Sequence, residues 1–459
     1  MRSMPDERVV IVGAGPCGLA AARELSARST TPFTVLEASD GPGGLAASRT
    51  DANGFTWDRG GHVVFSHYGE FDRLLAEVMG DDVHHHERSS FVRVGESWVP
   101  YPFQNNLHRL PANVAEQCLR GLIEASTTQP APPADPGAEL DFATWMAATF
   151  GSGIVEHFMR PYNEKVWAQP ASAMSAQWMA ERVATVDWRQ AVHAVVHRED
   201  DVAWGPNNLF AFPTTGGTGE IYTRAARDID THIRYRCPVE AVDPEARSLT
   251  TAHGEVISYT HLLWTGPLDQ LVALLSTVPD DVTASAGALV HNSVTVVGVG
   301  YETPLTDDRS WLYFPDPDVP FYRATNFAKY AAANVPDGRT DRYCSWMTEI
   351  ASSSWRPLDE HDIGRRVDAA LRQIGLVPND AAIATVHIDH VEYGYPVPTL
   401  GRDAALATIQ PWLMQHDILA RGRFGAWRYE LGNMDHAVKM GIDAAHRIID
   451  GTPEQAWAA

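Results

Sequence analysis

The chain is poor in cysteine and in basic residues, and it lacks any apolar run as long as a membrane helix. It contains four cysteines (Cys17, Cys118, Cys237 and Cys344) in 459 residues and no Cys-x-x-Cys pair, which argues against a disulfide framework and a zinc site. Lysine and arginine number 36 against 58 aspartates and glutamates, so the formal net charge is −22. This balance argues against nucleic-acid and anionic-membrane partners, which bind clustered basic faces.

The N-terminal residues lead into an apolar segment without the long apolar stretch of a signal peptide. We therefore expect a cytoplasmic protein with reduced thiols and no nucleic-acid or membrane partner, and a homo-oligomer is left open. The run His84-His85-His86 does not indicate a metal site, because consecutive side chains point in different directions and no further ligand follows at a suitable spacing. We expect a solvated loop there and no bound metal.

The N-terminal segment has the pattern of a dinucleotide cradle. The apolar run Val9–Val12 leads into three glycines at GxGxxG spacing, and Glu37 ends a second apolar run 19 positions after the last of them. Gly13 permits the tight turn, Gly15 lets the backbone approach a pyrophosphate, and Gly18 lets the following helix pack against the strand. The acid can accept hydrogen bonds from ribose hydroxyls. The pattern therefore predicts a bound dinucleotide.

A second glycine-rich segment distinguishes between dinucleotides. Residues 41–45 read Gly-Pro-Gly-Gly-Leu and follow closely after Glu37, and residues 57–62 add Trp-Asp-Arg-Gly-Gly-His. This succession resembles FAD-dependent oxidases of the amine-oxidase and glutathione-reductase-like superfamily. The resemblance favours FAD over NAD.

The length exceeds that of a single core, so we expect an α/β protein of several parts. Its Rossmann-like FAD-binding domain would carry an inserted, mostly helical domain and a mixed β-sheet substrate domain. The expected parts are 1–105 (FAD-binding, first part), 106–200 (helical insertion with nucleotide-binding residues), 201–265 (FAD-binding, second part), 266–400 (mixed sheet) and 401–459 (return to the FAD domain).

Seven longer motifs occur in the order in which UDP-galactopyranose mutases carry them. They occupy residues 60–68, 98–106, 160–168, 181–184, 311–315, 321–325 and 422–436. The chain resembles this family, and its longer eukaryotic form more closely than the short bacterial one. The similarity extends from Val9 to about Gly451.

The resemblance implies an FAD-dependent isomerase that interconverts the pyranose and furanose forms of a nucleotide-activated hexose, UDP-galactopyranose to UDP-galactofuranose in the first place. In the family's mechanism, N5 of the reduced flavin attacks the anomeric carbon, the nucleoside diphosphate leaves, and the sugar opens as an iminium adduct before the ring closes again. The flavin works in its reduced form, so the resemblance also implies NADPH or NADH as the reductant.

The resemblance also assigns roles to individual residues. Arg182 and Arg323 would grip the diphosphate, and His62 would lie on a loop beside the flavin. The substrate-binding residues implied are Tyr101, Phe103, Gln104, Asn163, Trp167, Asn207, Tyr313, Tyr330, Tyr395 and Tyr429. The cofactor-binding residues implied are Gly13, Gly15, Pro16, Gly18, Glu37, Ala38, Gly44, Leu45, Gly61, Val239, Arg423, Asn433 and Met434, with Arg88 and Ser90 as candidates for NADPH and Arg423 as a further one.

Each role competes with a purely structural interpretation. Arg182 can be a surface arginine of a helix, Arg323 a strand arginine paired with an acid, and the tyrosines ordinary parts of the core. Three departures from the family concern the sugar side: Thr215 replaces an arginine, Tyr393 replaces a histidine, and Lys329 replaces a small or amide residue.

These departures leave a GDP-hexose or a dTDP-hexose open as the substrate, since one hydrogen bond can change specificity greatly. Two further alternatives are an amine-oxidase-like oxidase or desaturase and a non-catalytic binding protein similar to the GDP-dissociation inhibitors. The paired arginines have no role in the oxidase, and the intact glycine turns argue against a protein without flavin.

Overall fold

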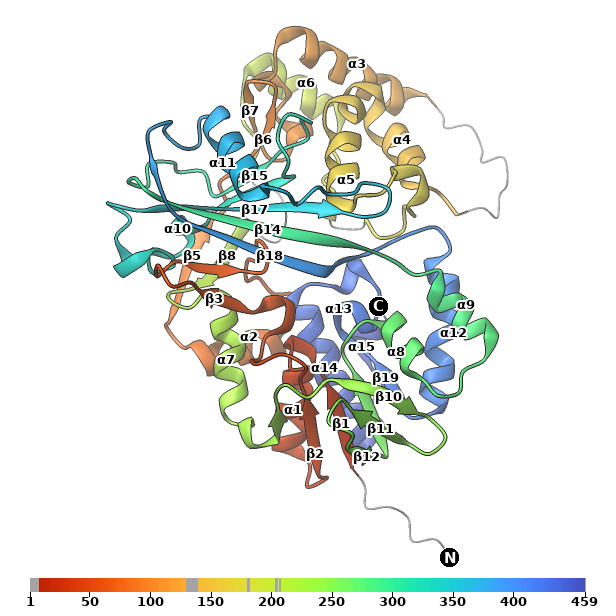
Figure 1. Cartoon of the computed structure of the whole chain (residues 1–459). Helices are drawn as coiled ribbons and strands as arrows, with labels where there is room; N and C mark the ends of the chain where they lie inside the picture. Colours follow the sequence, from red (N-terminus) through yellow and green to blue (C-terminus); the bar gives the residue numbers. More distant parts are fainter. Residues whose placement is uncertain (1–7, 129–138, 180–181, 203–204, 206–207, 459) are drawn as a thin grey trace, which may run out of the picture.

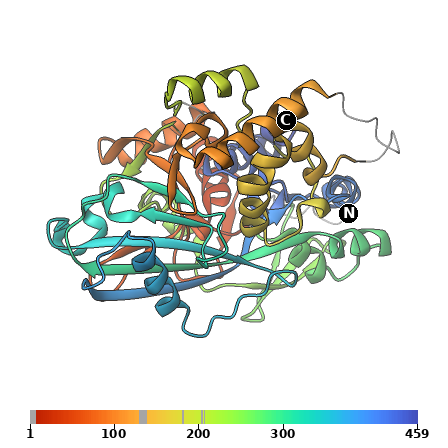
Figure 2. The same cartoon turned by 90° about the horizontal axis from the view of Figure 1, so that it is seen from above.

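The computed structural model describes residues 8–128, 139–179, 182–202, 205 and 208–458. Figure 1 shows a lower lobe built on a parallel sheet, a long mixed sheet that crosses the middle of the molecule, and a group of helices above it. Seen from above, the helical group and the mixed sheet lie side by side over the lower lobe (Figure 2).

The lower lobe is centred on a five-stranded parallel sheet. In spatial order its strands are β19 (Ile418–Ala420), β13 (His261–Trp264), β1 (Val9–Val12), β2 (Phe33–Leu36) and β9 (Ile233–Arg234). The strands are short and apolar, as expected where both faces of a parallel sheet are covered. The α/β class and the Rossmann-like first unit predicted from the sequence are confirmed.

Different elements cover the two faces of this sheet. On one face, Val9 and Ile11 share a core with four helices: α1 (Pro16–Arg28), α2 (Gly69–Met79), α7 (Gly219–Arg227) and α14 (Met434–Asp450). On the other face, Val10 and Leu262 pack with an antiparallel sheet and three helices. These are β10 (Val239–Asp243), β11 (Ser248–Thr251), β12 (Val256–Ser258), α8 (Leu268–Leu274), α9 (Asp280–Gly287) and α12 (Arg402–Gln415).

The mixed sheet has seven strands drawn from distant parts of the chain. In spatial order they are β18 (Ala382–Val397), β14 (Val290–Glu302), β17 (Cys344–Ser352), β16 (Arg323–Asn326), β15 (Trp311–Tyr313), β6 (Ser90–Val94) and β7 (Ser97–Pro100). Only the β15–β6 pair within this sheet is parallel. Helix α11 (Ile363–Gln373) packs against one face.

The other face of the mixed sheet meets the helical group. The helices are α3 (Ala112–Thr127), α4 (Phe142–Ile154), α5 (Arg160–Trp167) and α6 (Trp188–His197). A π-helical turn, Val155–Met159, joins α4 directly to α5. The buried Trp167 at the end of α5 packs in the same core as Val296 and Met347 of the sheet, which fixes the helical group over β14 and β17.

Short elements complete the lower lobe. They are β3 (Ser48–Thr50) paired with β4 (Thr56–Asp58), α13 (Gly422–Gly425) and α15 (Gln455–Ala458). The short helix α10 (Phe327–Tyr330) follows β16 and packs against β17 of the mixed sheet. The prediction of a solvated loop at His84–His86 is wrong, because these residues belong to strand β5 (Val83–Glu87), which pairs with β8 (Leu209–Pro213). A cross-strand ladder satisfies their backbone groups, and the ring nitrogen Nε2 of His86 lies 2.8 Å from the Tyr330 carbonyl oxygen.

The division of the chain into five parts remains a prediction, and the sheets differ from it at one place. Strands β6 and β7 lie in the range expected for the first FAD-binding part, but they pair in the mixed sheet. No helix of the described residues is long and apolar enough to cross a membrane.

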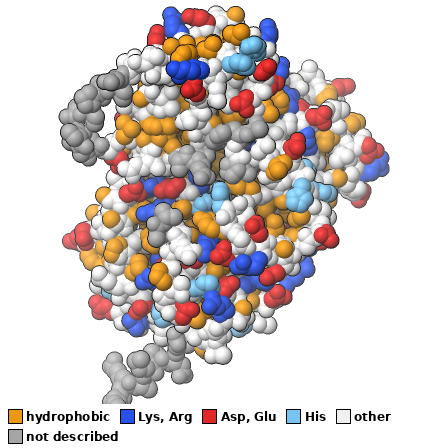
Figure 3. Space-filling view, turned by 180° about the vertical axis from the view of Figure 1, so that it is seen from behind, with side chains coloured by type: hydrophobic (Ala, Val, Ile, Leu, Met, Phe, Trp, Pro, Cys, Tyr) orange, Lys and Arg blue, Asp and Glu red, His pale blue; other side chains and the backbone are white. Residues whose placement is uncertain are grey.

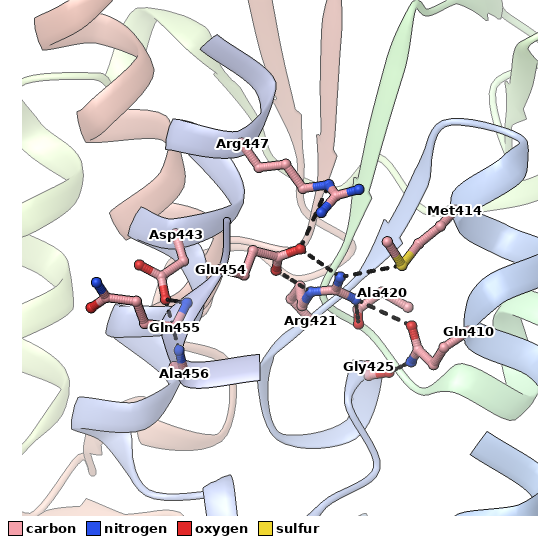
Figure 4. A network of polar contacts seen from close by, with 10 residues as sticks. All are labelled: Gln410, Met414, Ala420, Arg421, Gly425, Asp443, Arg447, Glu454, Gln455 and Ala456. Carbon is pink, nitrogen blue, oxygen red and sulfur yellow. Dashed lines mark hydrogen bonds and ion pairs between the residues drawn. The ribbon is translucent and has the colours of Figure 1, made fainter. Parts of the chain in front are cut away.

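A buried ion pair ties the C-terminal segment to the parallel sheet (Figure 4). Arg421, which follows β19, donates from Nε and Nη2 to the Glu454 carboxylate at 2.5 and 2.8 Å. The two side chains are 0% and 2% exposed. Gln410 accepts a further hydrogen bond from Nη1 at 3.1 Å, and the Trp457 ring lies 4.4 Å from the guanidinium carbon.

Candidate active site

The first glycine turn follows β1, and two of its glycines leave no room for a side chain. A Cβ on Gly13, whose φ is +102°, would lie 2.2 Å from the hydroxyl oxygen of Thr265, and one on Gly18 would lie 1.9 Å from the Gly13 carbonyl oxygen. Gly15 is the N-cap of α1 and Pro16 its first residue, so no side chain caps this end of the helix. An uncapped helix N-terminus suits a pyrophosphate.

Glu37 and the second glycine turn lie against the first. The Glu37 carboxylate accepts hydrogen bonds from Ala14 N at 2.6 Å and from Ser39 N at 2.8 Å. Gly43 N donates to the Ala14 carbonyl at 2.9 Å, which joins the two turns. Three other residues predicted for this part of the cofactor follow in the chain: Ala38 directly after the acid, and Gly44 and Leu45 in the 3-10 turn Gly44–Ala46. Val239, at the start of β10, is distant in the chain but follows Cys237, whose backbone N donates to the Glu37 carbonyl at 2.8 Å.

The second end of the predicted cofactor site is the start of α14. Met434 is its first residue and Asn433 its N-cap, and no side chain caps the helix. Arg423 donates from Nη1 to the Gly432 carbonyl at 2.8 Å. A glycine cradle that excludes side chains, a buried acid beside it and two uncapped helix starts fit an FAD molecule.

Three arginines meet around an aromatic group next to this helix start. The guanidinium carbon of Arg182 lies 4.7 Å from the Tyr429 ring, and that of Arg423 lies 4.8 Å from the Tyr395 ring. Arg323 donates from Nη2 to the Tyr395 hydroxyl at 3.3 Å. The Trp167 ring contacts both tyrosines, with centroids 4.7 and 5.8 Å apart. Five residues predicted for the site, together with Arg423, are therefore brought together.

A second row of rings continues from Arg323. Its guanidinium carbon lies 4.8 Å from the Trp311 ring, which stacks 6.2 Å from Tyr313. Tyr313 stacks 5.0 Å from Tyr101, and the Arg88 guanidinium carbon lies 5.2 Å from the Tyr101 ring. The residues predicted for the nucleotide and for NADPH thus adjoin the arginine group.

Arg323 is held by an acid that the sequence did not single out. Glu349 of β17 accepts from Nε at 2.6 Å and also from Nη2, and the two side chains are 13% and 2% exposed. Burial opposes the charge of the guanidinium, yet the adjacent carboxylate raises the pKa of Arg323 well above its usual value. Burial likewise opposes the charge of Glu349, and the arginine holds the pKa of its carboxyl below the usual range. Both groups stay ionised.

His62 lies next to this ion pair. Burial lowers the pKa of His62 to about 4, and the charges of Arg423 and Arg323 act in the same direction against the opposing effect of Glu349. The imidazole is therefore neutral at pH 7. Its buried Nδ1 atom has no hydrogen-bond partner among the described residues, which leaves this nitrogen for a ligand.

The remaining predicted substrate residues, with two exceptions, belong to the core next to the stacked tyrosines or contact it. The Phe103 ring packs at a tilt against Phe158, with centroids 4.8 Å apart, Gln104 donates to the Ala184 carbonyl, and Asn163 donates to the Met159 carbonyl at 2.7 Å. The side-chain oxygens of Gln104 and Ser90 are buried without a partner among the described residues.

Tyr330 is the first exception, because its ring packs against Phe212 and His86 rather than against the tyrosines of the arginine group. Asn207 is the second, since it lies outside the described residues.

Sequence reasoning missed Glu349, Tyr322 and Trp311, although all three contact Arg323. One signal was present: Glu349 is the only acid in the apolar stretch 344–351, where β propensity and apolarity predict a buried strand. A carboxylate in such a strand needs a buried partner.

Comparison with known proteins agrees with this architecture. Residues 16–449 match the family described as flavin containing amine oxidoreductase, so the chain belongs to this class of flavoproteins. The crystal structure of reduced UDP-galactopyranose mutase superposes with a TM-score of 0.93 at 37% sequence identity, over 98% of this chain and 97% of that one. The chain is therefore a member of the UDP-galactopyranose mutase family, and it is an enzyme of the isomerase class.

More distant structures share the fold alone. A CLA-producing fatty acid isomerase from P. acnes has a TM-score of 0.67 at 14% identity, over 97% of this chain and 100% of that one. Cyclohexylamine oxidase from Brevibacterium oxydans has a TM-score of 0.66 at 18% identity, over 97% and 99%.

Proposed function

We propose that this flavin-dependent mutase interconverts the pyranose and furanose forms of a nucleotide-activated hexose, with UDP-galactopyranose as the first substrate to test. The observation that carries the proposal is the meeting of Arg182, Arg323 and Arg423 around Tyr395 and Tyr429 beside the cofactor cradle. Acidic and basic side chains are interspersed over the face seen in Figure 3, so a cluster of three arginines in a chain of net charge −22 points to an anionic ligand.

The arginines would hold the diphosphate of the substrate. Arg182 donates to the Asn433 side-chain oxygen at 3.2 Å and to the Glu430 carbonyl, so its partners among the described residues are neutral and its charge remains for a phosphate. Guanidinium groups bind phosphate through paired N–H donors, and the bonds strengthen where water is excluded. The hydroxyls of Tyr395 and Tyr429 would add single hydrogen bonds of about 1 kcal/mol each.

Reduced flavin, when bound, supplies a nucleophilic nitrogen for the anomeric carbon of the sugar. The protein would contribute position and charge: the arginines neutralise the leaving diphosphate and retain it for the return step. His62 is neutral at pH 7, so it adds no further positive charge, and its buried Nδ1 can accept or donate a hydrogen bond according to the tautomer.

The stacked pair Tyr101 and Tyr313 supports a flat base. The side-chain oxygen of Gln104 has no partner among the described residues, which supports a base edge with a hydrogen-bond donor, as in uracil. Arg88, together with the Ser90 hydroxyl, which is also without a partner in the described part of the chain, supports NADPH or NADH as the reductant. A GDP-hexose or dTDP-hexose remains the alternative substrate.

Buried, reduced thiols suit a reducing compartment, so we propose that the enzyme works in the cytoplasm.

The test is incubation of the dithionite-reduced holoenzyme with UDP-galactopyranose, followed by chromatography of the products. We expect conversion to the furanose isomer without oxygen uptake, and no conversion with oxidised flavin. GDP- and dTDP-hexoses are the matched substrates. Equal conversion by the oxidised enzyme, or steady oxygen uptake with a substrate amine, would contradict the proposal.

A further inference from the structure

One carboxylate links the loop of His62 to the arginine group. Glu349 lies on β17 and is 2% exposed. Its Oε1 accepts hydrogen bonds from Gly61 N at 2.8 Å and from Arg323 Nε at 2.6 Å. Its Oε2 accepts from the Tyr322 hydroxyl at 2.6 Å and from Arg323 Nη2. A single side chain thus receives four donors from the loop and from the neighbouring strand.

The sheet register fixes this arrangement. Arg323 and Glu349 are directly opposite each other in the antiparallel pair β16–β17, so their side chains leave the sheet on the same face. The carboxylate occupies the Nε and Nη2 edge of the guanidinium. Among the described residues no hydrogen bond engages Nη1, which leaves this end of the arginine for an anion.

The loop lies directly on the same carboxylate. A Cβ on Gly61 would lie 3.0 Å from Oε1 of Glu349 and 2.9 Å from the Thr325 hydroxyl oxygen, so only glycine brings the peptide this close. Any change in how strongly Arg323 holds the carboxylate therefore changes how strongly the carboxylate holds the Gly61 peptide. His62 is the next residue in the chain, so its backbone position depends on that peptide.

We propose that Glu349 is a positioning residue that couples the occupancy of the diphosphate site to the Gly61–His62 loop; this rests on the proposed function. A diphosphate bound to Arg323 competes with Glu349 for the guanidinium, so the attraction between Arg323 and Glu349 weakens. The carboxylate then accepts a stronger hydrogen bond from Gly61 N. Coupling between two sites is reciprocal, so loss of the Gly61 N–Glu349 hydrogen bond must in turn change the affinity for diphosphate.

The experiment is hydrogen–deuterium exchange of the FAD-loaded protein with and without saturating UDP, read in peptides that contain residues 60–62. We expect UDP to slow exchange there at least about fivefold, the low end of typical coupling between sites. In Glu349→Gln the charge is lost and the amide nitrogen faces an arginine donor, so the UDP effect should fall below about twofold although UDP still binds. Glu392→Gln, on β18 of the same sheet and with a 63% exposed carboxylate, is the control and should behave as wild type.

The outcomes separate the inference from the function. UDP binding by wild type without a change in the loop, or an equal change in Glu349→Gln, overturns the inference alone. A wild-type protein that binds none of UDP, GDP and dTDP overturns the proposed function together with the inference. If Glu349→Gln does not retain FAD, Tyr322→Phe removes one donor from the same carboxylate and must alter the UDP effect on the loop; an unaltered effect overturns the coupling.

Discussion

Replacement of Arg182 by alanine tests the diphosphate assignment most cleanly. Among the described residues Arg182 has only neutral partners, the Asn433 amide and the Glu430 carbonyl, and the face of the Tyr429 ring. Its removal therefore leaves no buried charge without a partner. Arg323 differs, because its removal would leave the buried Glu349 carboxylate unpaired and would lower stability together with binding.

The expected loss of UDP binding free energy in Arg182→Ala can be estimated from the contacts of this side chain. Truncating one partner of a buried, hydrogen-bonded charge pair costs about 2–5 kcal/mol. The Arg182 side chain is partly exposed, which favours the lower half of that range. A loss of about 3 kcal/mol weakens UDP binding roughly 150-fold at 25 °C. The thermal unfolding midpoint should change little, because the arginine packs on the rim of the core rather than within it.

Calorimetric titration of the holoenzyme with UDP measures the affinity, and the ratio of flavin to protein absorbance measures cofactor content. We expect Arg182→Ala to retain FAD and to lose UDP affinity, with Arg189→Ala on the exposed side of α6 as the control. An Arg182→Ala protein with wild-type affinity and turnover would refute the assignment of this arginine to the diphosphate.

Three further predictions concern single groups. Tyr395→Phe should weaken UDP binding about fivefold, equivalent to one hydrogen bond, and unchanged affinity in the titration would remove its hydroxyl from the site. Burial raises the pKa of Asp58 to about 6, above its usual 3.8, so the folded state binds this proton more tightly than the unfolded state. Wild type should therefore lose stability as pH rises from about 4 to 6, and Asp58→Asn should lack this loss in thermal unfolding. Parallel curves of unfolding midpoint against pH for the two proteins would contradict the reasoning. Arg421→Met leaves the buried Glu454 with only Arg447, 3.8 Å away, as an ionic partner. The loss should cost about 3 kcal/mol in unfolding experiments, the low end of the range for breaking a buried pair, and the double variant with Glu454→Leu should recover most of it. A single variant as stable as wild type would be inconsistent with the buried pair.

The cofactor cradle could be predicted from the sequence because its signals are local. Gly13, Gly18 and Glu37 lie within one strand, turn, helix and strand, and each is specified by backbone geometry or by a direct contact inside that unit. A mixed sheet was expected from residues 266–400, but the pairing of β6 and β7 within it could not be predicted in the same way. Pairing of β6 with β15 joins residues more than 200 positions apart, and no short-range pattern records it.

The same contrast between local sequence signals and long-range strand pairing applies to the candidate site. Arg182 and Arg323 were found through long motifs, yet the structural interpretation of Arg323 as a strand arginine paired with an acid also proved correct. Its partner Glu349 escaped notice because strand register, rather than a motif, sets the two side chains opposite each other. The histidine run failed as a loop because its partner strand, β8, lies far along the chain.

The parallel sheet places β19 at one edge, and α14 covers the first helix, so the lower lobe unites the first and last portions of the polypeptide. β1 ends at Val12, whereas β19 begins at Ile418. On a translating ribosome the two are separated by synthesis times on the order of tens of seconds. During that interval the nascent chain contains β1 and β2 but neither β19 nor α14, so the flavin site is incomplete. We therefore expect flavin to bind only after β19 and α14 have been synthesised and have packed on the first strands.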